Sequence, residues 1–206
     1  MRRVFSFPGF LTIFTLVLLC TALPPFGTQS ENLKYVHVVP QRLSVIGYER
    51  ELFGHDWGTN ATTGCTTREE IIKTQLNVEY PLPGCAVVAV GTCPYSGVQI
   101  ASQSDDPDYA DVDIDHLFPL AAAWDLGAFA WSEQKRVAFA NDPANLVAVS
   151  QQENRRKSDS LPSDWLPSKR SNRCWYVNQI TDIAVKYQLS LSASDVAVMQ
   201  RQCLFR

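Results

Sequence analysis

The feature of the sequence that most constrains this fold is its set of cysteines, together with the N-terminal segment that decides whether they are oxidised. The chain opens with two arginines, continues with an apolar run over about residues 10–19, and then has small residues. That order is typical of a secretory signal peptide, and the run is short for a membrane span. We expect a signal peptide over residues 1–22, with cleavage after Ala22 or as late as Gly27, and a secreted, extracellular product. An uncleaved N-terminal anchor is the alternative.

Five cysteines remain after that cleavage, and secretion favours disulfide bonds between them. The chain has no Cys-x-x-Cys pair, so a structural zinc site is not expected. Five is an odd number, so one thiol is free or pairs with another chain. Cys174 and Cys203 flank the C-terminal region and are expected to pair, which would staple two antiparallel helices. One bond is expected among Cys65, Cys85 and Cys93, and the sequence does not choose between the three pairings.

Size and charge limit the ways in which this chain could bind a partner. Its 206 residues are 46% hydrophobic and 19% charged, as in an ordinary globular protein, and we expect a single domain over residues 30–206. Two of the 18 Lys and Arg lie in the expected leader, against 21 Asp and Glu, so the mature chain has a net charge of about −5. A protein that binds nucleic acid through its overall charge is basic. Binding of a polyanion would therefore have to be local or assisted by a cation.

Short strands and helices are mixed along the chain, which indicates an α+β fold. Alternating or β-branched runs mark the strands, and Ser or Thr followed by acidic residues marks two helix starts. The expected strands cover residues 34–39, two pieces within 84–102, 111–118 and 144–150. The expected helices cover residues 66–80, 174–189 and 192–203, and a further helix could open within 151–159. Residues 43–54 read as short helix or extended, 119–142 as helix or compact loop, and 161–174 as loop.

Three polar motifs, far apart in the chain, occur in a distinctive order. In the first, "DVDIDHLFP", Asp115 and His116 come directly before a short apolar run and a proline. In the second, "NDPANLVAVS", Asn145 opens a β-branched strand. In the third, "QQENRRKSD", Asn154 follows nine residues after the previous asparagine, and Lys157 follows three residues later.

This order of one histidine and two asparagines resembles the HNH endonucleases. Their usual opening is D-H-[IL]-x-P, and their closing half runs from N-L-x-x-[VL] to N-x-x-K-[GS]-D, as in "ANLVAVSQQENRRKSDSLP". The HNH domain of the RNA-guided CRISPR nuclease has a similar opening and a similar spacing between the asparagines. The closer resemblance, over most of the mature chain, is to secreted bacterial HNH proteins related to the C-terminal domain of GmrSD-type restriction enzymes. The shared stretches include "YERELFGHDW", "GCTTREEI", "CPYSG", "IDHLFPLAAAW", "FANDPANLVAVS" and "RCWYV".

The resemblance implies a ββα-metal (His-Me finger) core over about residues 107–165, with flanking helices and a disulfide-stapled C-terminal helical pair. In that core Asp115 and His116 end the first strand, residues 146–149 form the second strand, and Asn154 starts the helix. The segment between His116 and Asn145 is long for a minimal HNH motif. It is therefore expected to be an insertion between the two strands.

The chemistry of phosphodiester hydrolysis suggests a role for each of these residues. The reaction needs an activated water, a cation on the phosphate and stabilisation of the departing 3′ oxygen. A histidine that is neutral near pH 7 suits the first task, so His116 is the expected general base. Asp115 and Asn154 are the expected oxygen ligands of one divalent cation, Mg²⁺ in first place and Mn²⁺ or Ca²⁺ as alternatives. The resemblance implies that Asn145 orients the histidine or its loop by hydrogen bonding.

The remaining charged residues near the motifs are expected to contact substrate or solvent. Arg68 either forms a structural ion pair or clamps a phosphate. Asp111 and Asp113 are expected to be solvated, although Asp113 could also lie beside the metal ligands. Three basic residues that follow Asn154 are expected to contact neighbouring phosphates: Arg155, Arg156 and Lys157.

These features together predict a secreted, metal-dependent HNH endonuclease that hydrolyses phosphodiester bonds of nucleic acid. We expect DNA as the substrate, and a 5′ phosphate and a 3′ hydroxyl as the products that the family mechanism implies. No stable membrane association is expected once the signal peptide is removed. Two alternatives stay open: an extracellular binding protein that keeps an HNH scaffold without catalysis, and a nuclease that acts mainly on RNA. The sequence does not indicate the oligomeric state.

Overall fold

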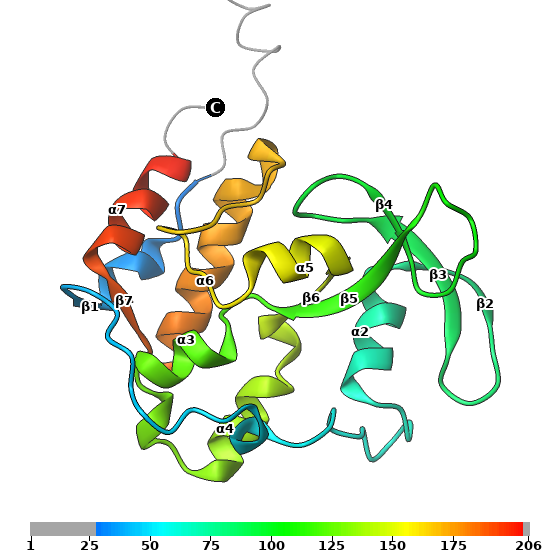
Figure 1. Cartoon of the computed structure of the whole chain (residues 1–206), viewed down its shortest axis with the longest axis horizontal. Helices are drawn as coiled ribbons and strands as arrows, with labels where there is room; N and C mark the ends of the chain where they lie inside the picture. Colours follow the sequence, from blue (N-terminus) through cyan, green and yellow to red (C-terminus); the bar gives the residue numbers. More distant parts are fainter. Residues whose placement is uncertain (1–27, 204–206) are drawn as a thin grey trace, which may run out of the picture.

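A five-stranded sheet with the strand order β2-β3-β4-β5-β6 forms the scaffold of the computed structural model, which describes residues 28–203 (Figure 1). The expected signal peptide lies outside the described residues. β4 and β5 are parallel, and the other neighbouring strands are antiparallel. The strands are β2 (Asn77–Pro81), β3 (Val87–Thr92), β4 (Gln99–Ala101), β5 (Ala110–His116) and β6 (Leu146–Ser150).

Helices surround the β5–β6 end of this sheet, so the α+β class expected from the sequence is confirmed (Figure 1). A second, two-stranded parallel sheet joins β1 (His37–Val39) to β7 (Ser190–Ser192). No helix within residues 28–203 combines the length and the apolar character that a membrane span requires. The α-helices are α2 (Thr67–Gln75), α3 (Leu120–Asp125), α4 (Glu133–Ala140), α5 (Gln151–Lys157), α6 (Arg173–Tyr187) and α7 (Ala193–Gln202). The 3-10 helices are η1 (Glu31–Tyr35), η2 (Arg50–Phe53), η3 (Ala128–Ala130), η4 (Pro143–Asn145) and η5 (Arg170–Asn172).

Helix α2 is shorter than the sequence suggested. Its start is as expected, because Thr66 and Glu69 form a capping box. The prediction of helix through residue 80 was wrong, since the helix ends at Gln75 and the following residues form β2, paired with β3. Leu76 packs at this transition against Gly91 of β3, where an added Cβ would lie only 2.6 Å from Leu76 Cδ2. The close approach of the helix end to the sheet explains why a glycine stands near the end of β3.

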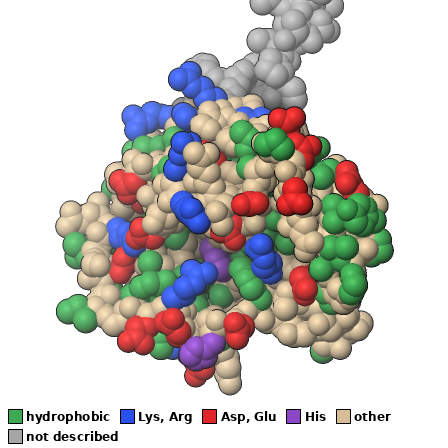
Figure 2. Space-filling view, turned by 45° about the vertical axis from the view of Figure 1, so that its right-hand side comes forward, with side chains coloured by type: hydrophobic (Ala, Val, Ile, Leu, Met, Phe, Trp, Pro, Cys, Tyr) green, Lys and Arg blue, Asp and Glu red, His purple; other side chains and the backbone are tan. Residues whose placement is uncertain are grey.

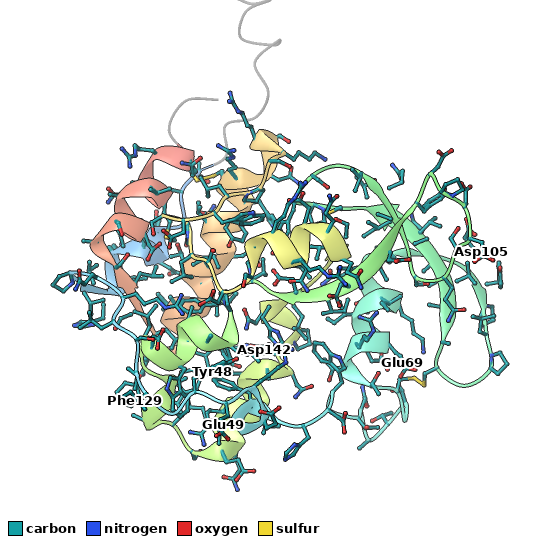
Figure 3. All side chains as sticks on the ribbon, in the orientation of Figure 1. Tyr48, Glu49, Glu69, Asp105, Phe129 and Asp142 are labelled. Atoms are coloured by element: carbon teal, nitrogen blue, oxygen red, sulfur yellow. A yellow bond between two sulfur atoms is a disulfide. The ribbon has the colours of Figure 1, made fainter. Side chains whose placement is uncertain are left out.

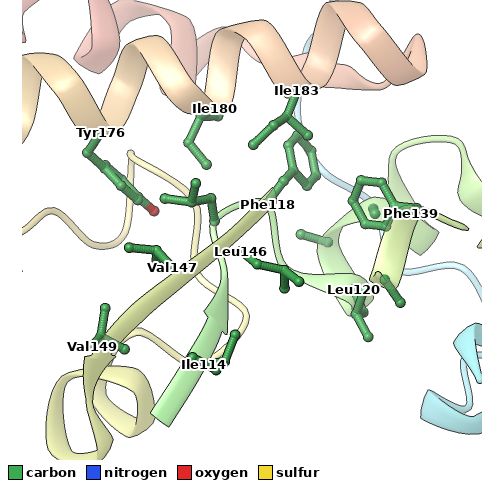
Figure 4. Packing of buried hydrophobic residues seen from close by; sticks show 14 of the residues in the cluster. Ile114, Phe118, Leu120, Phe139, Leu146, Val147, Val149, Tyr176, Ile180 and Ile183 are labelled. Atoms are coloured by element: carbon green, nitrogen blue, oxygen red, sulfur yellow. The ribbon is translucent and has the colours of Figure 1, made fainter. Parts of the chain in front are cut away.

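Strand β6 is buried along its whole length although it is the last strand of the sheet. One reason is that α6 covers it with apolar side chains, among which Tyr176, Ile180 and Ile183 face Leu146 and Val147 (Figure 4). A second reason lies at the free edge of the strand. There the Gln75 amide donates to the carbonyl of Leu146 (2.9 Å) and accepts from the N–H of Ala148 (2.8 Å). The side chain of Gln75 thus replaces a missing neighbour strand.

Two disulfides each join segments that are 20 to 29 residues apart in the chain. Cys174–Cys203 joins the start of α6 to the end of α7, as predicted. Cys65–Cys85 joins the loop before α2 to the β2–β3 hairpin, and this is the bond that the sequence left open. Cys93 is the free thiol among the described cysteines, and it is fully buried.

Replacing both Cys174 and Cys203 with serine is expected to lower the free energy of unfolding by about 3 kcal/mol. The bond closes a loop of 29 residues, and its loss gives the unfolded chain more conformational freedom. Urea unfolding of the secreted protein, with and without the two substitutions, measures this difference. An unchanged urea midpoint would contradict it, and Cys93→Ala serves as a control that removes a sulfur without opening a loop.

Candidate active site

The three expected motifs meet in one β–β–α unit made of β5, β6 and α5. β5 and β6 are antiparallel, with Asp115 opposite Val147 and His116 opposite Leu146. α5 follows β6 directly, because the hydroxyl of Ser150 caps the helix by accepting from the N–H of Glu153. The helix therefore starts at residue 151, and Asn154 lies in its middle. The resemblance had implied that Asn154 starts the helix, and that expectation was wrong.

His116 is held by its Nε2 atom, which lies 2.8 Å from the carbonyl oxygen of Ala140. A carbonyl oxygen only accepts, so Nε2 carries the hydrogen and Nδ1 of the neutral ring keeps the lone pair. Burial lowers the pKa of His116 to about 4, and the positive charges of Arg50 and Lys157 act in the same direction. The imidazole is therefore neutral at pH 7, with one nitrogen free to accept a proton.

A tryptophan covers one face of that imidazole. The ring of Trp57 is stacked on the ring of His116, with 5.6 Å between centroids and 7° between planes. The stacking and the bond to Ala140 together fix both the position and the orientation of the ring. Trp57 belongs to the "FGHDW" stretch, which lies almost sixty residues earlier in the chain.

Asn145 holds the loop that follows His116. It is fully buried, its Oδ1 accepts from the N–H of Phe118 (2.8 Å) and its Nδ2 donates to the carbonyl of Phe118 (3.2 Å). The backbone of Leu117 adds a bond to the carbonyl of Asn145 (2.8 Å). Asn145 makes these contacts to the loop and not to the imidazole, so it holds the backbone that follows His116.

Asp115 lies beneath this loop and is surrounded by donors. Tyr95 donates its hydroxyl to Oδ2 (2.6 Å), and Nζ of Lys157 lies 3.0 Å from Oδ1 and 2.9 Å from Oδ2. Burial raises the pKa of the Asp115 carboxyl, and the attraction of Lys157 and the hydrogen bond from Tyr95 oppose that rise. The carboxylate is thus buried, and Tyr95 and Lys157 donate hydrogen bonds to both of its oxygens.

The structure places Lys157 differently from the expected contact with a substrate phosphate. Its side chain is fully buried, and Nζ also donates to the carbonyl of His116 (2.8 Å). Burial lowers the pKa of Lys157, and Asp115 opposes this change. The ammonium faces the interior because α5 packs directly against β5, and this position joins the helix to the strand.

Asn154, Asp113 and Arg68 form a second polar group, which is only partly buried. Asn154 Nδ2 donates to Asp113 Oδ2 (2.8 Å), and Arg68 lies 3.5 Å from Asp113 Oδ1. Arg68 also donates to the carbonyl of Val112 (3.3 Å), so it forms the ion pair that was one of its two expected roles. Asp113 is consequently a bonded side chain rather than a solvated one, whereas Asp111 is exposed as expected.

Two adjoining cavities bring these residues together. The first, of about 280 Å³, is lined by Asp115, His116 and Asn154 among others. The second, of about 220 Å³, lies against Trp57 and shares Arg50 and His116 with the first. Figure 2 shows a hollow with a histidine at its floor and Lys and Arg side chains on both sides of it.

The N-terminal segment before α2 supplies the second wall of these cavities. Tyr48, labelled in Figure 3, lies beside α3, where its ring meets that of Trp124 at 6.3 Å. Sequence reasoning did not assign a site role to Tyr48, Arg50, Trp57 or Tyr95. The only signal was that all four fall in stretches shared with the resembled family. Of the expected phosphate contacts, Arg156 pairs with Glu153 (2.8 Å), and neither it nor Arg155 lines either of these two cavities.

The oxygen donors in the first cavity suit a hard divalent cation. The Asp115 carboxylate and the Asn154 amide both line it, and hard cations such as Mg²⁺ take carboxylate, amide and water oxygens. The amide nitrogen of Asn154 is bonded to Asp113, which leaves its oxygen for such a ligand. Elsewhere among residues 28–203, Cys65, Glu69 and Cys85 bring potential ligand atoms together, but the two sulfurs are joined to each other.

The comparisons with known proteins agree with the motifs. The model of the family described as "GmrSD restriction endonucleases, C-terminal domain" matches residues 69–194. An uncharacterized secreted protein of Arthroderma benhamiae is 34% identical over 180 residues, which cover 86% of this chain and 84% of that protein. No solved structure matches the chain.

Asn145→Ala is expected to lower the free energy of unfolding by about 3 kcal/mol, because the buried N–H and carbonyl of Phe118 lose their partners. Urea unfolding measures the loss without reference to any activity. Asn77→Ala is the matched control, since Asn77 is exposed on β2, and it should change stability by less than about 0.5 kcal/mol. Equal effects of the two substitutions would show that the loop does not depend on Asn145.

Proposed function

Because this chain belongs to the family of the GmrSD restriction endonuclease C-terminal domain, as its motifs indicated, we propose that it is a metal-dependent endonuclease. It hydrolyses phosphodiester bonds of nucleic acid, with DNA as the proposed substrate. The observation that supports this most directly is a neutral, oriented histidine, His116, in the same cavity as two oxygen donors, Asp115 and Asn154. A binding protein has no need of a histidine whose one nitrogen is fixed and whose other is kept unprotonated.

His116 acts as the general base in this proposal. Its Nδ1 takes a proton from water, and the imidazolium that forms is stabilised by the Nε2 bond to the carbonyl of Ala140. The stacked ring of Trp57 offers its π face to the same developing charge. Asn145 keeps the base in place by fixing the loop at Phe118.

Asp115 and Asn154 would hold a divalent cation, Mg²⁺ in first place, and such an ion when bound supplies positive charge to the phosphate and to the departing 3′ oxygen. Tyr95 and Lys157 orient the Asp115 carboxylate, and Asp113 orients the Asn154 amide. Second partners of this kind fix the direction of a ligand atom and tune its basicity. The proposed products are a 5′ phosphate and a 3′ hydroxyl.

The protein is proposed to act outside the cell. Two disulfides join four of the described cysteines, and a relative of similar length is described as secreted. Disulfides persist in oxidising compartments, and a buried free thiol such as Cys93 is compatible with them.

His116→Ala is expected to lower the rate of plasmid nicking by about a thousandfold, because the water loses its base. The assay uses the secreted protein with Mg²⁺ or Mn²⁺, and EDTA should stop the reaction of the unchanged protein. His37→Ala is the control, since His37 is an exposed histidine on β1 that bonds to Ser190. Duplex DNA, single-stranded DNA and RNA are tested side by side to identify the substrate.

Full nicking activity of His116→Ala, or activity that survives EDTA, would refute the proposed mechanism. Binding of nucleic acid without any cleavage by the unchanged protein would favour a catalytically silent binding protein. Cleavage of RNA alone would correct the proposed substrate while leaving the mechanism intact.

A further inference from the structure

The basic residues around the site are nearly all bound to acidic groups of the protein itself. Arg68 pairs with Asp113, and Lys157 pairs with Asp115. Two further arginines are similarly occupied: Arg42 with Asp125 and Asp159, and Arg156 with Glu153. A substrate phosphate would therefore have to displace an internal partner in order to bind any of them.

Arg50 is different. Its side chain is exposed, and within residues 28–203 no acidic group or hydrogen-bond acceptor pairs with it. It lines both cavities, which share only Arg50, His116 and Leu120. A cation at this junction lies beside the proposed general base and faces the space that a substrate would enter.

The main chain on both sides of Arg50 is held by packing contacts, whereas the side chain of Arg50 is exposed. Tyr48 packs against Trp124, and Phe53, almost fully buried, packs against Phe139 of α4 at 6.2 Å. Arg136 of α4 also donates to the carbonyl of Leu52 (3.1 Å). The main chain at Arg50 is thus fixed, so a ligand would have to order only the guanidinium.

The cavities are lined by several acidic residues, so a phosphate could bind there only beside a cation. Asp115, Asp159 and Asp56 line them, and the whole chain carries a net charge of −3. The first two acids are matched by Lys157 and Arg42. Within residues 28–203, Arg50 is the cation in the lining of these two cavities and has no acidic partner, so a phosphate entering near His116 would meet it. A guanidinium is the group best suited to a phosphate, because its planar donors match two phosphate oxygens at once.

We propose that Arg50 binds a phosphate group of the nucleic acid substrate at the junction of the two cavities. The inference rests on the proposed function, since it assigns a substrate contact to the same site. It replaces Lys157, Arg155, Arg156 and Arg68 as the main phosphate contact beside the base. It also gives the segment before α2 a direct part in substrate binding, although that segment precedes the residues that match the family model.

The test compares Arg50→Ala, Arg50→Lys and Arg201→Ala. Arg201 is an exposed arginine on α7 that lines neither cavity. Arg201→Ala is therefore the control, because it changes the net charge by the same amount as Arg50→Ala but away from the site. Binding of a short labelled duplex is measured in the His116→Ala background with Mg²⁺, over a range of KCl concentrations, so that the duplex stays intact. Cleavage is measured with the same Arg variants in the active protein, and thermal unfolding checks that each remains folded.

Arg50→Ala should weaken duplex binding about tenfold and reduce the slope of log affinity against log salt by about one, because one phosphate contact is lost. KM should rise by a similar factor. Arg50→Lys should restore the salt slope and part of the affinity, since it keeps the charge but not the paired donors. Arg201→Ala should match the unchanged protein.

Equal affinities and equal salt slopes for Arg50→Ala and Arg201→Ala, in a protein that binds and cleaves, would overturn the inference and leave the proposed function standing. A lower kcat with unchanged affinity would also overturn it, because the residue would then act without binding the ground-state phosphate. A protein that neither binds nor cleaves any nucleic acid would refute the proposed function, and the role of Arg50 with it.

Discussion

The buried contact between Lys157 and Asp115 is the interaction on which the site depends. Both side chains are almost completely removed from water, which costs several kcal/mol per ion unless strong bonds replace the lost hydration. Here the ammonium is bonded to both carboxylate oxygens and to the carbonyl of His116, and Tyr95 adds a further donor to the carboxylate. Removing one partner would leave the other charge buried alone. The pair therefore fixes α5 against the end of β5, and this brings Asn154 to the same cavity as Asp115.

The long segment between β5 and β6 is more than an insertion, because it helps to hold His116 in place. It contains α4, whose last residue, Ala140, supplies the carbonyl that fixes the tautomer of His116. It also contains Phe139, which contacts Phe53 and thereby supports the segment that carries Arg50. The two bonds from Asn145 to Phe118 close this segment at its base. The same residues that lengthen the motif thus orient the histidine at its start.

Much of the fold could be predicted from local sequence signals. The capping box at Thr66, the β-branched strand after Asn145 and the Cys174–Cys203 bond each follow from patterns within a few residues or from position in the chain. The features that could not be predicted are tertiary. Nothing local to Lys157 distinguishes an ammonium that faces a carboxylate from one that faces water. The choice of Cys85 over Cys93 likewise depends on how the β2–β3 hairpin lies against α2.

The site is therefore larger than its motifs. One wall comes from β5 and α5, within the residues that match the family model, and the other comes from residues 48–57, which precede them. Trp57 covers a face of His116 that the β–β–α unit alone would leave open to water. Exposure to water would raise the pKa of the imidazole toward its ordinary value, because burial is the main cause of its depression. The N-terminal segment thus helps to keep the proposed base unprotonated. The protonation state of His116 therefore depends on residues outside the β–β–α unit as well as within it.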